Sequence, residues 1–477
     1  MTTPRFAIAI LAAGKGTRLK SKLPKVLHRI AGLSLLGHVV RAASQIVPAA
    51  DIYCIIGHEA ERVRQEIAPF GVQFVEQTEQ RGTGHAIMQC RQALAAYDHV
   101  LVLSGDVPLI RPETIAGVRD FHIARKASMT ILTARPPDPF GYGRIVRRVE
   151  HSAETDHVAA IVEQKQLTPA QESIGEINSG IYAFQVPELF ARIDRLSTDN
   201  PHGEYYLTAI AAILGQEGLP VLALPTAHAT EVLGVNTRRE LAQLDAILRE
   251  RKARELMDNG VTIFKPETVM IDADVQVGAD TVIEPFVQLL GNTVLGEDCL
   301  VRSFSVLTNL KCGNGVKIHQ GTIAEDSTVG DAAVIGPYAR LRLGSQIGPE
   351  AHVGNFVETK KTSLGRGAKA NHLSYLGDAE IGERTNIGAG TITCNYDGVN
   401  KSTTKIGAGA FIGSDTTLVA PVSIGDGAYI GAASCITKDV PADSLGLTRP
   451  EQVVKEGWAT AKRARLEAAK LAAAKKK

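Results

Sequence analysis

The chain has 477 residues, 44% of them hydrophobic and 22% charged, which is ordinary for a soluble globular protein of two or three domains. Its 52 Lys and Arg and 51 Asp and Glu leave a net charge of +1, which argues against general nucleic-acid binding. No stretch is long and apolar enough to cross a membrane, and six scattered cysteines without a CxxC pair predict reduced thiols in a cytoplasmic protein.

Short apolar runs alternate with helical patterns in the first half of the chain. We expect strands at 6–13, 51–57 and 99–106, and helices at 35–45, 58–68 and 113–126. This alternation predicts a Rossmann-like α/β domain with a mainly parallel sheet, which we assign to residues 1–236. Ligand sites in such a domain lie at the carboxyl ends of its strands.

A linker helix is expected at residues 237–260. Leu241, Leu244 and Leu248 are spaced along one helical face, and Asn259-Gly260 supplies a stop signal. This helix would connect the first domain to a region with a different sequence period.

Aliphatic residues recur every six positions beyond the linker, a spacing that matches no helical face. They are Ile271, Val277, Ile283, Leu289, Leu295, Val301 and Leu307, then Ile323, Val329, Ile335, Leu341, Ile347 and Val353, then Ile406, Ile412, Leu418, Ile424, Ile430 and Ile436. Such repeats predict a parallel β-helix over 261–447, in which each short strand sends one aliphatic side chain inward.

Two polar, basic segments interrupt this period, at 357–363 and 393–405. We expect both to be loops that carry binding groups, because solenoid proteins place such groups in loops. The remaining residues, 448–477, are basic and rich in alanine. They predict a solvated helix without a catalytic role.

A glycine-rich turn, GKGTR at 14–18, follows the first apolar run. A dinucleotide fingerprint would need glycine in place of Leu19, and a P-loop would need Lys-Ser/Thr after the last glycine. A turn with free N–H groups, followed by Arg18 and Lys25, suits instead a nucleoside triphosphate whose leaving pyrophosphate must be stabilised.

This turn resembles the signature of the sugar-phosphate nucleotidyltransferases, L-x-x-G-x-G-T-R followed by P-K. The matching residues are Leu11, Gly14, Gly16, Thr17, Arg18, Pro24 and Lys25. Further motifs similar to that family follow in order: EQRGTGHAI at 79–87, LSGDVPLI at 103–110, then GYGRI, IVEQK, EINSGIY and GVNTR.

The resemblance implies a site for UTP, a sugar 1-phosphate and Mg²⁺ in the first domain. Arg18 and Lys25 would be catalytic, and Asp106 and Asn236 would hold the metal. The residues implied for nucleotide and sugar binding are Leu11, Ala12, Ala13, Gly14, Lys25, Gln77, Gly82, Thr83, Ser104, Gly105, Asp106, Gly141, Glu163, Asn178 and Asn236. Of these, Gln77, Gly82 and Thr83 would contact uracil, and Gly141, Glu163 and Asn178 the sugar.

The segment from 339 to 398 closely resembles the acetyltransferase half of the bifunctional N-acetylglucosamine-1-phosphate uridyltransferase/glucosamine-1-phosphate acetyltransferase family. His372 is the candidate catalytic base, since imidazole can take a proton from an attacking amine. The resemblance implies glucosamine-phosphate binding by Arg342, Lys360, Tyr375 and Asn386, and acetyl-CoA binding by Ala389, Asn395, Tyr396, Ser414, Ala432 and Arg449. It also implies a left-handed β-helix and a homotrimer with these sites between subunits.

The sequence therefore predicts a two-site enzyme that acetylates glucosamine 1-phosphate with acetyl-CoA and then transfers a uridylyl group from UTP to the product. One alternative is a single-activity nucleotidyltransferase whose β-helix only assembles the oligomer, and another is a non-catalytic sensor of sugar nucleotides. His372, Lys360 and the CNYDG segment argue against a pure scaffold. The departures from the family pattern are Ser104, Gln166 and Ala209, all in the first domain.

Overall fold

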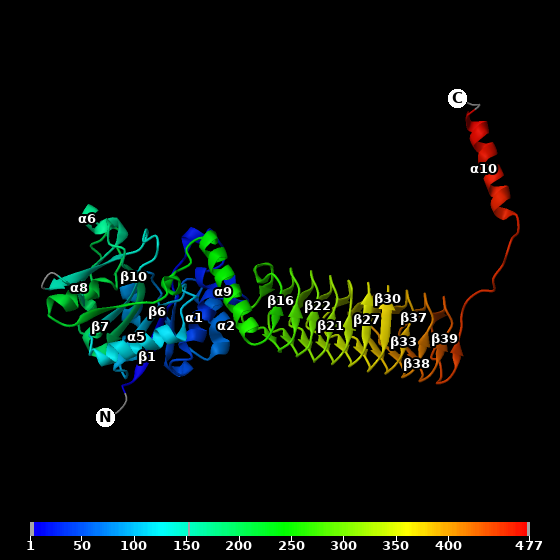
Figure 1. Ribbon diagram of the computed structural model, residues 1–477, viewed down its shortest axis with the longest axis horizontal. Coiled ribbons are helices and arrows are strands. Elements are labelled where there is room, and N and C mark those ends of the chain that lie inside the picture. The colour runs from blue at the N-terminus through cyan, green and yellow to red at the C-terminus, as the bar shows by residue number, and fades with distance from the viewer. Residues whose placement is uncertain (1–3, 151–152, 475–477) are drawn as a thin grey trace. The chain divides into compact units, whose positions relative to one another are not determined.

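The computed structural model describes residues 4–150 and 153–474 (Figure 1). The chain divides into two compact units, one formed by Met1–Glu255 with Ile271–Asp274 and the other by Leu256–Met270 with Val275–Lys477. All six cysteines are free thiols. Within the described ranges, no helix combines the length and the apolar character that a bilayer span would require.

A nine-stranded sheet forms the centre of the first unit, in the order β5-β4-β1-β6-β10-β7-β11-β9-β8. Its strands are β1 (Phe6–Leu11), β4 (Ile52–Ile56), β5 (Gln73–Glu76), β6 (His99–Ser104), β7 (Met129–Ala134), β8 (Arg144–Glu150), β9 (Ala153–Val162), β10 (Ile177–Gln185) and β11 (Val221–Pro225). β1 pairs in parallel with β4 and β6, whereas β10 lies antiparallel between β6 and β7. The predicted mainly parallel α/β architecture is confirmed, with β1, β4 and β6 at the three expected strands.

Helices cover both faces of this sheet. They are α1 (Leu35–Ala43), α2 (Ala60–Ile67), α3 (Thr83–Gln89), α4 (Arg91–Leu94), α5 (Pro112–Ala124), α6 (Pro169–Glu172), α7 (Val186–Phe190) and α8 (Ala209–Gln216). β1 explains why two cores form: Ile8 and Ile10 pack with α1, α2 and α5, while Ala7 and Ala9 pack with α3, α7 and α8. A strand buried on both faces reads as a continuous apolar run, as Phe6–Leu11 does.

A pair of histidines, one buried and one half-buried, links α5 to this sheet. His122 of α5 is fully buried, its Nδ1 lies 2.9 Å from the hydroxyl of Thr130, and its ring meets that of His99 edge-on at 5.1 Å. Burial lowers the pKa of His122 to about 3, and His99 adds like-charge repulsion. The imidazole is therefore neutral in the folded chain at neutral pH.

The first prediction concerns stability against acid. The folded pKa of His122 lies below the unfolded value of about 6.5, so its contribution is complete above that pH and is lost as pH falls toward 3. We expect urea unfolding between pH 7 and 5 to show a free energy that falls by up to about 1.4 kcal/mol per pH unit more in the wild type than in His122→Phe. The exposed His228→Phe is the matched control. Parallel pH profiles for the wild type and His122→Phe would contradict this assignment.

Three parallel sheets build the second unit as a β-helix (Figure 1). One runs from β12 (Thr262–Ile263) to β41 (Leu445–Gly446), the second includes β16 (Gln288–Leu290) and ends with β40 (Cys435–Ile436), and the third runs from β14 (Gln276–Val277) to β38 (Val422–Ile424). The repeated aliphatics point inward, as Ile283, Leu289, Val301 and Leu307 show by complete burial. The predicted parallel β-helix is confirmed.

The prediction for Ile323 is wrong. Its side chain is 40% exposed, and the inward position belongs to Ala324, which is 1% exposed. β19 (Val306–Thr308) pairs with β22 (Ile323–Glu325) so that Leu307 lies opposite Ala324. This coil is one residue shorter than three six-residue steps. Because neighbouring side chains of a strand face opposite ways, the shift turns Ile323 outward.

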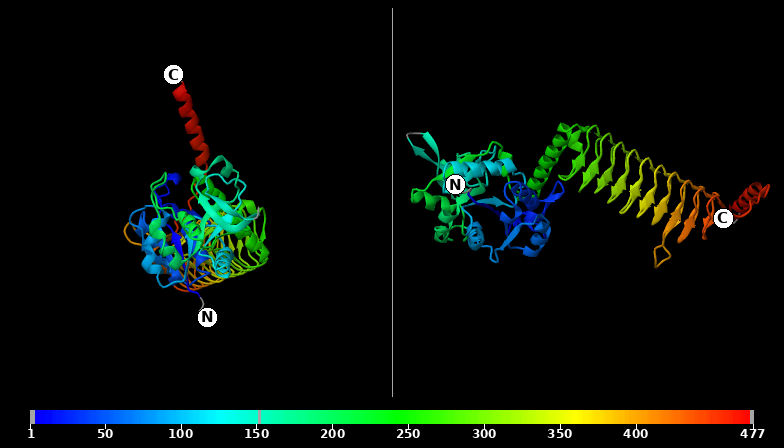
Figure 2. Two further views of the ribbon diagram at one scale, coloured as in Figure 1. Left: turned by 90° about the vertical axis from the view of Figure 1, so that its left-hand side faces the viewer. Right: turned by 90° about the horizontal axis from the view of Figure 1, so that it is seen from below.

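The first predicted loop, at 357–363, is also wrong. β28 (Glu358–Lys360) continues the β-helix there, with Thr359 fully buried where an aliphatic residue would stand. Its hydroxyl lies 2.8 Å from that of Ser345, so burial leaves it hydrogen-bonded. The second loop does leave the coil, between β34 (Ile392–Cys394) and β35 (Thr404–Ile406). It projects as a hairpin in the right-hand view of Figure 2.

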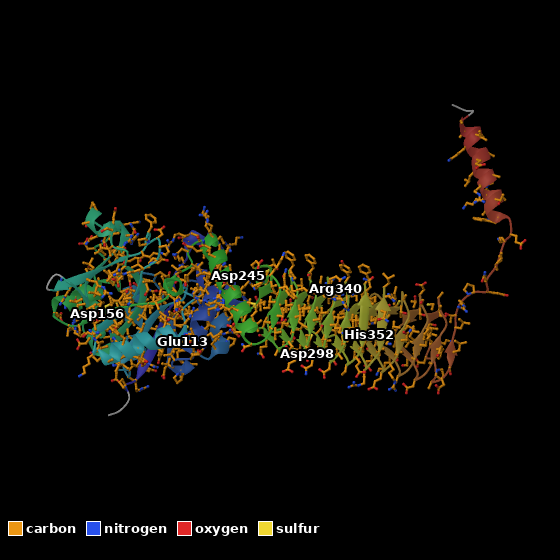
Figure 3. The ribbon with its side chains drawn as sticks, in the orientation of Figure 1. Glu113, Asp156, Asp245, Asp298, Arg340 and His352 are labelled. Carbon is orange, nitrogen blue, oxygen red and sulfur yellow. The ribbon has the colours of Figure 1, made fainter. Side chains whose placement is uncertain are left out.

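Two further helices are α9 (Arg238–Asp258) and α10 (Trp458–Ala474). Leu244 of α9 is buried with Leu109 and Val235, and Leu241 and Leu248 pack against that cluster. Asp245 of α9, labelled in Figure 3, accepts hydrogen bonds from the Ala31 N–H at 2.7 Å and from Arg249. α10 has no buried residue.

Candidate active sites

The glycine turn lines a cavity of about 620 Å³ in the first unit. The cavity lies where β1 and β6 end, at Leu11 and Ser104, which is the edge at which parallel α/β sheets bind ligands. The predicted nucleotide residues that line it are Leu11, Ala12, Ala13, Gly14, Lys25, Gln77, Gly82, Thr83, Ser104 and Asp106.

A second cavity of about 860 Å³ shares Thr17, Thr83 and Glu204 with the first. The predicted catalytic and sugar residues that line it are Arg18, Gly141, Glu163 and Asn178. The shared residues make the two cavities neighbours, so one long ligand could occupy both.

Hydrogen-bonding side chains line the second cavity, which holds the predicted sugar residues. The amide of Asn178 donates to the hydroxyl of Tyr182 at 2.8 Å, and Thr208 donates to Glu163 at 3.4 Å. Burial raises the pKa of Glu163, although the Thr208 hydroxyl opposes this. A partly buried carboxyl among amide and hydroxyl groups is suited to a ligand rich in hydroxyls.

Two cations, a carboxylate and an amide oxygen converge at the nucleotide cavity. Lys25 forms an ion pair with Asp106 and donates to Oδ1 of Asn236 at 2.8 Å. Arg18 donates to the same oxygen at 2.7 Å. Glu240 fixes Asn236 from the start of α9 by accepting its N–H at 2.6 Å. This arrangement suits a ligand that carries phosphate together with a divalent metal.

The loop implied for uracil depends on Gly82. This residue has a φ of 103°, and a Cβ there would lie 2.6 Å from the carbonyl oxygen of Tyr205. The neighbouring Gly84 N–H donates to that same oxygen at 2.8 Å. A side chain at Gly82 would therefore push the loop away from the chain that anchors it.

Two predicted residues lie outside the cavity lining. Gly105 joins the ends of β1 and β6, since its N–H donates to the Leu11 carbonyl at 2.9 Å. Asn236 reaches the site through Lys25 and Arg18. Gly105 thus positions the backbone that carries Asp106.

In the second unit, four predicted residues form a row along one corner of the β-helix. Backbone hydrogen bonds link the coils of this row: Gly390 to His372, Asp415 to Ala389, and Ala433 to Ser414. The row ends at Ala432, whose carbonyl accepts from Arg449 at 3.3 Å. His372 ends β30 (Lys369–His372), and its exposed imidazole has no protein hydrogen-bond partner in the described chain.

A basic row lies at the next corner, across β31 (Tyr375–Gly377). Lys360 forms an ion pair with Asp378 at 3.6 Å, and Asn395 donates to the same carboxylate. Arg342, a coil away, pairs with Glu358 at 2.8 Å. Three residues of strand, about 10 Å, separate this row from the row of His372.

The implied glucosamine-phosphate residues are not all together in one chain. The Tyr375 hydroxyl lies over Gly377, where an added Cβ would be 2.4 Å from it, and so lies near Asn395. Asn386 belongs instead to β33 (Asn386–Ile387), in the sheet of β30. Tyr396 lies in the projecting hairpin, where its hydroxyl donates to Gly398 at 2.5 Å.

Sequence reasoning missed three groups in these sites. Asp378 holds Lys360 and Asn395, Glu240 holds Asn236, and Tyr182 holds Asn178. Asp378 had a detectable signal, because it follows Lys360 by one coil of the repeat. Glu240 and Tyr182 had none beyond their closeness in sequence to predicted residues.

Two family models match the chain. The MobA-like NTP transferase domain matches residues 8–263, and the bacterial transferase hexapeptide (six repeats) matches 274–309 and 403–438. The first of these matches covers more than half of the chain and includes both cavities.

Several relatives match over nearly their whole length. The Bifunctional protein GlmU of Koribacter versatilis is 63% identical over 465 residues, which is 97% of this chain and 99% of that protein. Its namesake from Solibacter usitatus is 48% identical over 96% of this chain and 97% of its own length. That of Streptococcus agalactiae is 46% identical over 95% of this chain and 97% of its own length.

Proposed function

The chain belongs to the GlmU family of bifunctional transferases, and we propose that it makes UDP-N-acetylglucosamine in two steps. The β-helix transfers an acetyl group from acetyl-CoA to glucosamine 1-phosphate, and the first unit transfers a uridylyl group from UTP to the product. The observation that carries the second step is the convergence of Lys25, Asp106 and Asn236 at the nucleotide cavity.

In uridylyl transfer, a phosphate oxygen of N-acetylglucosamine 1-phosphate attacks the α-phosphorus of UTP. A new P–O bond forms, the bond to the β-phosphate breaks, and pyrophosphate leaves. Arg18 and Lys25 neutralise the departing charge, and the glycine turn holds the phosphates through its N–H groups. The protein contributes mainly position and charge.

Asp106 and Asn236 fit a magnesium ion. They supply a carboxylate and an amide oxygen, and Mg²⁺ is commonly held by one or two carboxylates together with substrate phosphates. The described residues contain no cluster of three or more His, Cys, Asp and Glu. The metal would supply further charge neutralisation at the phosphates.

In acetyl transfer, the sugar amine attacks the thioester carbon of acetyl-CoA. The C–N bond forms, the C–S bond breaks, His372 takes the proton that the nitrogen loses, and CoA leaves as its thiolate, which then takes up a proton. Arg342 and Lys360 bind the sugar phosphate, while Ala389, Ser414, Ala432 and Arg449 line the path of CoA along their corner.

We propose a homotrimer as the working form, and the same corner supports assembly of copies. The large apolar side chains Phe286, Phe304, Tyr338, Phe356 and Leu373 each expose at least half of their area there. Phe286 stacks on Phe304 at 5.3 Å, and Tyr338 on Phe356 at 5.6 Å. We name this set the corner ladder. An exposed row of apolar side chains indicates a surface that another copy of the chain would cover. Leu373 is next to His372 in the chain, so that copy would complete the acetyltransferase site.

A charge in the corner ladder is expected to dissociate the oligomer. Burying one phenylalanine contributes about 2 kcal/mol, so Phe304→Lys should weaken assembly by more than tenfold. Sedimentation equilibrium of the full chain measures this. Ile123→Lys, an exposed apolar position on α5, should leave the mass unchanged. A Phe304→Lys protein with the wild-type mass at every concentration would refute the ladder as the interface.

The test of the whole proposal is pyrophosphate release from UTP and glucosamine 1-phosphate with Mg²⁺, with and without acetyl-CoA. Release that requires acetyl-CoA supports both sites acting in the stated order. Release without acetyl-CoA would favour the alternative of a single-activity nucleotidyltransferase. Because both donors are cytoplasmic metabolites, we place the enzyme in the cytoplasm, without a nucleic-acid or membrane partner.

A further inference from the structure

A separate cavity of about 320 Å³ lies in the first unit, among α1, α9 and the segment that joins β6 to α5. No residue assigned above to UTP, sugar, metal or acetyl-CoA lines it. Its charged lining is Arg41, Arg111, Arg251, Lys252 and Glu255. With Asp274 and Glu231, whose carboxylates pair with Arg41 and Arg111, the cavity and its immediate partners carry four positive and three negative charges, which leaves one cation in excess.

One of these cations differs from the others in its partners. The paired cations are Arg41 with Asp274 at 2.8 Å, Lys252 with Glu255 at 2.8 Å, and Arg111 with the buried Glu231 at 3.0 Å. Arg251 has no carboxylate within ion-pair distance in the described ranges. It donates to the backbone carbonyl of Leu109, at 3.1 Å.

Two guanidinium groups therefore share a partly buried space with donors unused. Nη1 of Arg251 donates to the Leu109 carbonyl, and Nε of Arg111 pairs with Glu231. The other nitrogens of the two groups remain available to a ligand. Burial lowers the pKa of Arg251 and the charge of Arg111 lowers it further, while the carboxylate of Glu231 opposes this in part. An anion between the two groups would relieve this repulsion. Guanidinium groups bind phosphate oxygens in pairs, with more specificity than an ammonium group.

We propose that this cavity binds a phosphorylated small molecule, with its phosphate held by Arg251 and Arg111. The volume is at the lower end for small-molecule sites, which suits inorganic phosphate or a sugar phosphate better than a nucleotide.

Packing and backbone contacts also connect this cavity to Asp106 and Asn236, the proposed metal ligands. Leu109, which accepts from Arg251, packs in one cluster with Val235, and the Val235 N–H donates to the Asp106 carbonyl at 3.0 Å. The next residue is Asn236. The proposed phosphate site is therefore contiguous with the backbone that carries both proposed metal ligands.

The test is equilibrium dialysis of the full chain against radiolabelled inorganic phosphate, with UTP present to fill the nucleotide cavity. The wild type should bind phosphate at millimolar concentration or below, and Arg251→Gln should weaken this by roughly tenfold or more. Arg251→Lys should keep part of the affinity. Arg254→Gln, on the exposed side of α9, should match the wild type.

Three results would overturn the proposal. They are no phosphate bound by the wild type, equal binding by the wild type and Arg251→Gln, and loss of binding in Lys25→Ala instead, which would place the phosphate in the nucleotide cavity. Arg111 is unsuitable for the test, because its loss would leave the buried Glu231 unpaired. Thermal unfolding of Arg251→Gln and Arg251→Lys verifies that both variants are folded.

Discussion

Asp106→Ala is expected to lower uridylyl transfer by roughly 10³-fold and to leave acetyl transfer at the wild-type rate. The carboxylate of Asp106 lies at the end of β6 beside Asn236 and Lys25. Its removal takes the charged ligand from the proposed metal pair and leaves Lys25 without its ion-pair partner. Pyrophosphate release from UTP and N-acetylglucosamine 1-phosphate, measured across Mg²⁺ concentrations, should show a higher metal requirement and a lower maximum.

The matched control for this change is Asp120→Ala. Asp120 lies on α5, its side chain is 64% exposed, and it pairs with the neighbouring Arg119. It should behave as the wild type in both assays. An Asp106→Ala enzyme with the wild-type Mg²⁺ dependence would show that the metal is held elsewhere, whatever the size of its loss in rate.

His372→Ala is expected to have the opposite selectivity, with acetyl transfer lowered by roughly 10²–10⁴-fold and uridylyl transfer unchanged. The imidazole of His372 is exposed at the corner of the β-helix, next to the corner ladder, and lies in a row with Ala389 and Ser414. A base at that place can accept the proton of the attacking amine. Release of the CoA thiol from acetyl-CoA and glucosamine 1-phosphate measures this step.

His352→Ala provides the control for the second change. His352, labelled in Figure 3, lies in β27 (His352–Asn355), the strand that pairs with β30. It is also a histidine and lies one coil from His372, but on the outer face of the sheet and not at the corner. Equal losses in His352→Ala and His372→Ala would indicate damage to the β-helix and would remove His372 as the base.

Local sequence patterns were enough to predict most of the fold. The apolar run of β1 and the six-residue period are properties of short stretches, and each translates directly into a strand buried on both faces or a coil of the β-helix. The errors at Ile323 and at 357–363 both concern coils that keep the backbone pairing of the β-helix but break its six-residue side-chain pattern. The coil before Ile323 is one residue short. The coil at 357–363 buries Thr359, whose hydroxyl is hydrogen-bonded, in place of an aliphatic residue.

Periodicity and residue types at close spacing were sufficient to predict the α/β unit, the β-helix and the motif residues from Leu11 to Lys25. The folded structure was needed to see that Asn236 meets Lys25 and Arg18, that Asp378 pairs with Lys360 of the preceding coil, and that Arg251 and Arg111 line one basic cavity. These contacts are between residues that are far apart in the sequence. They depend on how helices pack and how coils stack, and no local pattern encodes that packing.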